Sequence, residues 1–205
     1  MRMNSLCFGL LLVCLFPVLV SAQEIGQPEL NLNWEELNIS RLTSQKRALW
    51  TLGGWAAANI VVGVGASFAS QGHWKHFHQF NAAWNSVNLA LAGFGLRDVY
   101  AADPAAFSGL ETLQEIESLQ KILLLNTGLD LAYLAVGGWL VTRAQVPDVK
   151  RPDMLKGFGN SLFLQGGFLL VFDSVFYLVL NSPRKQSLKW LEQLTVTGLG
   201  VNYTF

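Results

Sequence analysis

Two carboxylic acids lie in otherwise uncharged parts of this 205-residue sequence. Asp130 is the only charged residue in positions 122–142, and Asp173 is the only one in positions 157–183. A pair of carboxyl groups can act as acid and base, hold a cation, or pass a proton between them. Because neither stretch contains a Lys or Arg, we expect at least one of the two acids to carry a proton at neutral pH.

Three asparagines form a second polar row, in the uncharged stretch 76–96. Asn81, Asn85 and Asn88 are spaced by four and then three residues, which puts them on one face of a helix. An amide without a hydrogen-bond partner is costly in hydrocarbon, so we expect this face to turn toward other helices.

The polar residues fall near the middle of four long stretches that could cross a bilayer. Positions 48–72 and 76–96 precede the two acid-containing stretches, and a bilayer core needs about 20 apolar residues in a helix. At 1.5 Å per residue, both acids lie about 3–5 Å from the centres of their stretches, on the same side of the membrane. We therefore predict one polar interior layer, made of Asn59, Asn81, Asn85, Asn88, Asn126, Asp130, Tyr133, Gln165, Asp173 and Tyr177.

The composition also indicates lipid as the main surroundings. Hydrophobic residues make up 51% of the chain and charged residues 14%, against about 25% charged in an average soluble domain. The formal net charge is zero, and no basic run offers the electrostatic surface that nucleic acid requires. The expected partners are the bilayer and either a second copy of the chain or another membrane protein, with no nucleic acid.

The first 22 residues have the features of a cleavable signal peptide. Arg2 is followed by an apolar core and by Val-Ser-Ala before Gln23. Both cysteines, Cys7 and Cys14, lie in this segment, so the processed chain has no thiol for a disulfide, a nucleophile or a metal site. Cleavage would leave the mature N-terminus periplasmic. The distribution of Lys and Arg favours the opposite orientation, but the signal peptide acts first and decides our prediction.

The predicted fold class is all-α, a four-transmembrane-helix bundle in the bacterial inner membrane. It comprises a signal peptide (1–22), an extracytoplasmic N-terminal segment (23–47), the transmembrane domain (48–183) and a C-terminal tail (184–205). Within it, Ser108 and Glu111 have the spacing of a capping box. The C-terminal LTVTGLGVNYTF alternates like a strand, but no other segment shares that pattern, so we give it no structural weight.

Other conspicuous side chains have simpler interpretations than a functional site. His73, His76 and His78 do not share one helical face and lie beside Trp74 and Lys75, so they indicate a membrane interface and not a metal site. Trp50, Trp55 and Trp139 are interpreted as lipid-facing or interfacial residues. A small-residue stripe for close helix packing is predicted at Ala82, Ser86 and Ala90.

Three blocks of the sequence resemble an uncharacterised family of small bacterial multi-pass membrane proteins, known as a domain of unknown function. The blocks are FHQFNAAWNSVNLALAG, LLNTGLDLAYLAVGGWL and LKGFGNSLFLQGGFLLVFDSVFYL, and the resemblance covers roughly residues 45–182. It implies a helical bundle in a bacterial membrane. It implies no activity, catalytic residue, metal or cofactor.

Three functions are compatible with the polar layer. In the first, the amides and acids hold the bundle together, and the protein has a structural or partner-binding role. In the second, Asp130 and Asp173 serve a small-solute or proton-coupled carrier. In the third, the two acids act as acid and base in an intramembrane enzyme, although no Ser or His lies at their depth.

Overall fold

The computed structural model describes residues 34–192, 194–197 and 200–203, with side chains described as far as Asn181. The predicted signal peptide and residues 23–33 of the predicted extracytoplasmic segment lie outside the described residues. The other predictions can be set against the structure one element at a time.

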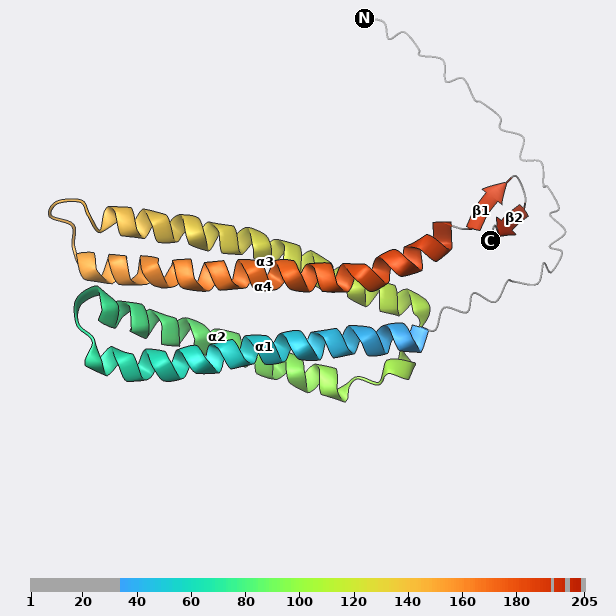
Figure 1. Cartoon of the computed structure of the whole chain (residues 1–205), viewed down its shortest axis with the longest axis horizontal. Coiled ribbons are helices and arrows are strands. Elements are labelled where there is room, and N and C mark those ends of the chain that lie inside the picture. Colours follow the sequence, from blue (N-terminus) through green and yellow to red (C-terminus); the bar gives the residue numbers. More distant parts are fainter. Residues whose placement is uncertain (1–33, 193, 198–199, 204–205) are drawn as a thin grey trace, which may run out of the picture. The chain divides into compact units, whose positions relative to one another are not determined.

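Four long helices make up most of the described chain (Figure 1). They are α1 (Trp34–Ala69), α2 (Gly72–Ala101), α3 (Gly109–Arg143) and α4 (Pro152–Glu192), with the short 3-10 helix η1 (Pro104–Ala106) before α3. Each predicted stretch coincides with most of one helix, which confirms the all-α architecture with four helices. By length and composition α1, α3 and α4 could each cross a membrane.

Local chemistry explains where several helices begin and end. Gly72 has a φ of +55°, a conformation that favours glycine, and it allows the sharp turn between α1 and α2. The predicted capping box at α3 is confirmed: the Ser108 N–H donates to Glu111 Oε2 at 2.8 Å, and the Glu111 N–H donates to Ser108 Oγ at 3.3 Å. Pro152 begins α4, at a position where its missing N–H costs no helical hydrogen bond.

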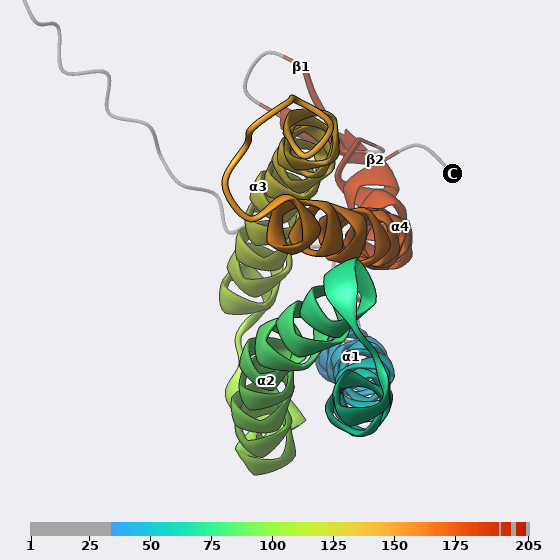
Figure 2. The same ribbon diagram turned by 90° about the vertical axis from the view of Figure 1, so that its left-hand side faces the viewer.

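The helices form two antiparallel hairpins, α1–α2 and α3–α4, and α2 packs on α4 (Figures 1 and 2). Glycines allow the closest approaches. A Cβ on Gly137 would lie 2.9 Å from the carbonyl oxygen of Gly159, so α3 and α4 meet backbone to backbone there. A Cβ on Gly157 would collide with the backbone of His73 and Phe77, so the start of α4 is equally close to α2. These seams hold the polar faces of the helices together.

The interior is unusually polar. Among the described residues, eleven polar or charged side chains are buried and eight hydrophobic ones are. Large hydrophobic side chains cover the outside instead, and Phe68 and Val61 are 87% and 73% exposed. A water-soluble domain buries its apolar side chains, so this inverted arrangement fits a bundle surrounded by lipid.

Two sequence interpretations need correction. The predicted small-residue stripe is wrong for Ser86 and Ala90, which are exposed, while Ala82 packs close to Gly63 of α1. The buried side of α2 is its asparagine face, which continues to Ala92. The strand-like C-terminal sequence does form strands, β1 (Leu194–Thr197) and β2 (Gly200–Tyr203), which pair antiparallel with Leu194 opposite Tyr203.

Candidate functional site

The asparagine row of α2 occupies the buried side of the helix. Asn81, Asn85 and Asn88 are all buried, and Asn85 is fully inaccessible to solvent. Asn85 Nδ2 donates to the carbonyl oxygen of Asn81 at 2.8 Å, and Asn88 Nδ2 donates to Asn85 Oδ1 at 3.4 Å. The row therefore forms a hydrogen-bonded path along α2, with a different group of side chains at each end.

At one end, Asn81 joins α1, α2 and α4. Its Nδ2 donates to Asn59 Oδ1 at 2.7 Å, and its Oδ1 accepts from Ser161 Oγ at 3.0 Å and from Gln165 Nε2. Trp55 Nε1 donates to Gln165 Oε1 at 3.1 Å, and Asn59 Nδ2 donates to the Trp55 carbonyl oxygen at 2.8 Å. We call these five residues the amide cluster. Each of its amide nitrogens and oxygens has a hydrogen-bond partner.

At the other end, Asn88 faces a cavity of about 280 Å³ that all four helices line. Its polar wall consists of Asn88, Asn126, Asp130, Tyr133 and Asp173, and no Lys or Arg is among the described residues that line it. We call it the carboxyl cavity. It contains five of the ten residues predicted for the polar layer, drawn from α2, α3 and α4.

The two acids meet in this cavity. The Asp130 and Asp173 carboxyl groups lie close enough to interact, and the Asn126 side chain lies close to Asp173. A hydrogen bond between two carboxyl groups requires a proton on one of them. The remaining oxygen of Asp130, Oδ2, is buried and has no hydrogen-bond partner in the described part of the chain. Asp130, a residue of the cavity wall, thus keeps one buried and unsatisfied acceptor.

Most of the remaining cavity wall is aliphatic, and Trp84 and Phe172 add aromatic rings to that of Tyr133. Trp84 of α2 and Tyr133 of α3 meet edge to face, with ring centroids 4.8 Å apart, and Phe172 lies on α4. The faces of such rings attract cations. Together with the acids, they make the carboxyl cavity complementary to a small positive charge.

The structure separates the predicted polar layer into two groups. Asn59, Asn81 and Gln165 belong to the amide cluster, Asn85 connects it to the carboxyl cavity, and the half-buried Tyr177 takes part in neither. Trp55, interpreted as a lipid-facing or interfacial residue, also has contacts inside the bundle. Its indole is half-buried and stacks on Phe168 with centroids 3.9 Å apart, besides its bond to Gln165. Trp55 lies one helical turn before Asn59, and this spacing indicates that the two side chains share the polar face of α1.

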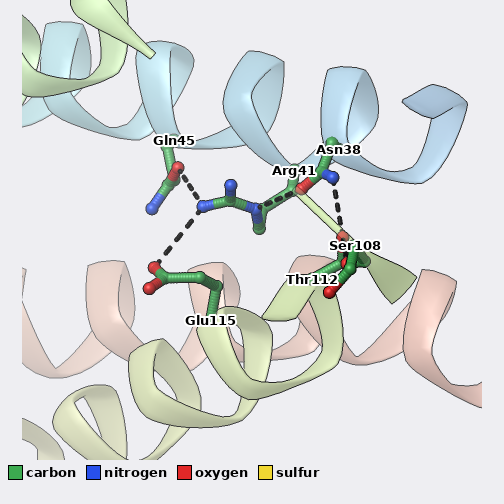
Figure 3. A network of polar contacts seen from close by, with 6 residues as sticks. All are labelled: Asn38, Arg41, Gln45, Ser108, Thr112 and Glu115. Atoms are coloured by element: carbon green, nitrogen blue, oxygen red, sulfur yellow. Dashed lines mark hydrogen bonds and ion pairs between the residues drawn. The ribbon is translucent and has the colours of Figure 1, made fainter. Parts of the chain in front are cut away.

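Sequence reasoning also missed a buried polar group between the beginnings of α1 and α3 (Figure 3). Arg41 Nε donates to Asn38 Oδ1 at 3.2 Å, and its Nη1 lies 3.7 Å from Glu115 Oε2. Asn38 Nδ2 donates to Thr112 Oγ1 at 2.6 Å. The Arg41 guanidinium also lies over the Phe107 ring, 4.9 Å from its centroid. These contacts tie the two parallel helices α1 and α3 together, outside the predicted membrane spans.

The pKa values of Arg41 and of the nearby Glu111 are shifted by their surroundings. Burial lowers the pKa of the Arg41 guanidinium below its ordinary value, and the nearby Glu115 carboxylate opposes that shift. The pKa of Glu111 is lowered because its carboxylate accepts hydrogen bonds from Ser108. The lowered pKa favours the charged form of Glu111, whose carboxylate completes the capping box of α3.

The described residues do not form a metal-binding site. No group of three or more His, Cys, Asp or Glu side chains in the described chain could hold an ion. The three histidines lie at the beginning of α2 in ring contacts. His76 meets Phe158 edge to face at 6.3 Å, and His78 meets Phe77 in the same way at 5.1 Å.

Comparison with known proteins places the chain in a family without assigning an activity. No curated protein and no solved structure matches the chain. A family model matches residues 51–174, which include the amide cluster and the carboxyl cavity. The resemblance seen in the sequence blocks is thereby confirmed at the level of the family: the chain belongs to the Family of unknown function (DUF6992).

Proposed function

We propose that the protein is a multi-pass membrane protein that binds a small cationic solute in the carboxyl cavity. In this proposal α2 crosses the membrane as well as α1, α3 and α4, and its asparagines face the interior of the bundle. The bundle lies in a bacterial inner membrane with its N-terminus in the periplasm. The inverted distribution of polar and apolar side chains supports the membrane setting. Mass spectrometry of the mature chain tests whether the predicted signal peptide is removed, because its cleavage would leave a protein that begins at Gln23.

The observation that carries the cation proposal is the pair of acids in a cavity without a counter-charge. Asp130 and Asp173 are 2% and 5% exposed, and the described lining includes no basic residue. A carboxylate near the bilayer centre costs about 2.5–3.5 kcal/mol or more, so a proton or another cation must accompany it. The unpartnered Asp130 Oδ2 is the acceptor left for that cation.

The size and wall of the cavity narrow the class of solute. A volume of about 280 Å³ is at the lower end of the range for small-molecule sites. The aromatic rings favour an organic ammonium, which gains from ring faces. A small ammonium compound would donate to Asp130 while its alkyl part contacts Trp84 and Phe172.

The shared proton suggests how binding is coupled to charge. With the cavity empty, one proton neutralises half of the pair. Entry of an ammonium ion would displace that proton, and the cavity would keep the same net charge. Such an exchange is the elementary step of a proton-coupled carrier. A carrier would need to open to both sides, and four helices are few for that, so this mechanism predicts more than one copy.

Calorimetry with methylammonium chloride tests the proposal on the purified full chain. The wild-type protein should bind one methylammonium per chain and release about one proton, detected from the dependence of the heat on the buffer. Asp130→Asn and Asp173→Asn should each lower the affinity at least tenfold. Asp98→Asn, at an exposed acid of α2 outside the cavity, is the control and should leave binding unchanged. Absence of binding by the wild type, or equal loss in D98N, would refute the cation site.

A structural or partner-binding role is the second candidate, and the amide cluster favours it. Hydrogen bonds that join three helices can serve only to hold the bundle in register. The two functions differ in what the acid variants do. Unchanged abundance with lost methylammonium binding supports the cation site, whereas loss of folded protein from D130N or D173N supports the structural role.

A further inference from the structure

A second hollow lies outside the bundle core, between α1 and α4. It is a groove of about 400 Å³, and its α4 wall is apolar and largely exposed. Val171, Val175 and Val179 lie one helical turn apart on this wall and are 64%, 53% and 46% exposed. The α1 wall differs, because it contains Ser44, Arg47 and Thr51. We call this hollow the α1–α4 groove.

Arg47 is the charged residue among the described residues that line this groove. It is exposed, and its side chain makes no ion pair or hydrogen bond within the described part of the chain. Its basic neighbours on α1 are engaged: Arg41 pairs with Glu115, and the Lys46 ammonium lies 4.6 Å from the Tyr100 ring centroid. Arg47 is thus a free positive charge beside an apolar surface, where an anion with an apolar tail would be complementary.

The direction of the groove agrees with that of a lipid in one leaflet. α1 and α4 run in opposite directions (Figure 1), and the stacking of Trp55 on Phe168 fixes the inner end of the groove. Its outer end then lies beside Ser44 and Val179. From Phe168 to Val179 a helix rises about 16 Å, close to half of the roughly 30 Å hydrocarbon core. Arg47 lies eight residues before Trp55, about 12 Å along α1, so an acyl chain that starts at Arg47 would run along the groove toward mid-depth.

We propose that the α1–α4 groove binds one phospholipid with an anionic headgroup, whose phosphate contacts Arg47 and whose acyl chain lies along Val171, Val175 and Val179. The contact between guanidinium and phosphate is the stronger, bidentate kind. This inference rests on the membrane placement proposed above. It does not rest on cation binding in the carboxyl cavity.

Native mass spectrometry of the delipidated full chain in non-ionic detergent tests this proposal. The probes are phosphatidylglycerol and phosphatidylcholine with the same acyl chains. One basic residue near a membrane surface contributes about a fivefold preference for anionic lipid. The wild-type chain should therefore retain one phosphatidylglycerol about fivefold more tightly than phosphatidylcholine.

Three variants separate the headgroup contact from the acyl-chain contact. Arg47→Gln should abolish the preference between the two lipids, whereas Arg97→Gln, at an exposed arginine of α2 outside the groove, should preserve it. Val175→Trp should fill the groove and weaken both lipids more than fivefold. Helical circular dichroism verifies that each variant is folded. Equal retention of both lipids by the wild type, or an equal effect of R47Q and R97Q, overturns the proposal, whatever the result with methylammonium.

Discussion

The amide cluster and the carboxyl cavity use similar side chains within one bundle, but they differ in how fully those side chains are satisfied. Asn81 uses both atoms of its amide, and its partners are themselves satisfied. In the cavity wall, Asp130 keeps a buried oxygen without a partner in the described part of the chain. Buried polarity alone therefore does not identify a binding site. An unsatisfied acceptor in the wall of a cavity is the better indication, and this contrast can be tested by substitution.

The largest effect on stability is expected from Asn81→Leu. This change removes three hydrogen bonds to Asn59, Ser161 and Gln165, each worth about 0.6–2 kcal/mol between membrane helices. The free energy of unfolding should fall by about 2–4 kcal/mol, measured by reversible unfolding in mixed micelles.

Asn88→Leu is the matched control for that variant. Asn88 lies on the same face of α2 but makes one long hydrogen bond and faces the cavity. Its replacement should cost less than about 1 kcal/mol while it weakens methylammonium binding. If N88L is as destabilising as N81L, the distinction between the two regions is wrong.

A smaller loss of stability is expected from a substitution at Gly166, where α4 approaches the α3 backbone at Asp130. A Cβ on Gly166 would lie 3.1 Å from the Asp130 carbonyl oxygen and 3.3 Å from Tyr133 Cβ. Gly166→Ala should therefore separate α3 from α4 slightly, at a cost of about 1–3 kcal/mol, and should weaken methylammonium binding.

Gly167→Ala is the control for this approach, because a Cβ at Gly167 meets nothing within 4 Å. Alanine has the better helix propensity, so G167A should be neutral or stabilising by up to about 1 kcal/mol. Unfolding and calorimetry on both variants decide the result. An equal result in both variants would mean that the close approach of Gly166 to Asp130 does not decide the cost.

The parts of the fold that follow from local pattern could be predicted from the sequence. The four helices follow from their uncharged lengths, the Ser108–Glu111 cap from its spacing, and the common face of Asn81, Asn85 and Asn88 from helical periodicity. Periodicity also places Asp130 and Asp173 on interior faces. It does not specify which interior partner each residue meets.

What could not be predicted depends on contacts between helices. Ser161 shows no pattern that points to Asn81, 80 residues away in the chain. The stripe at Ser86 and Ala90 competed with the asparagine face for the same interface, and a sequence alone gives no measure of which face the neighbouring helix covers. Arg41 was missed because α1 begins well before its uncharged stretch.

Trp55→Phe tests the edge of the amide cluster with a change smaller than the loss of Asn81. Phenylalanine retains the stacking on Phe168 but removes the hydrogen bond to Gln165 Oε1. The expected loss is about 0.5–1.5 kcal/mol, measured in the same micelles. An unchanged stability would show that Gln165 finds another donor and that the cluster is less tightly specified than its geometry indicates.

The smallest effect on stability is expected from the acids. If Asp130 and Asp173 share a proton as proposed, an Asn at either position provides an amide donor in place of the carboxyl O–H. We therefore expect D130N and D173N to change the free energy of unfolding by less than about 0.5 kcal/mol, within the range of substitutions that disturb no specific structural feature.

Small stability changes are informative when they accompany a lost ligand. Residues kept for binding are often neutral or unfavourable for folding, whereas residues kept for packing, such as Asn81, are not. If D130N lowers the free energy of unfolding by about 2 kcal/mol or more, the acids are structural groups like the amide cluster. Unchanged folding together with lost methylammonium binding would leave the cation as the reason that two acids occupy the interior of this bundle.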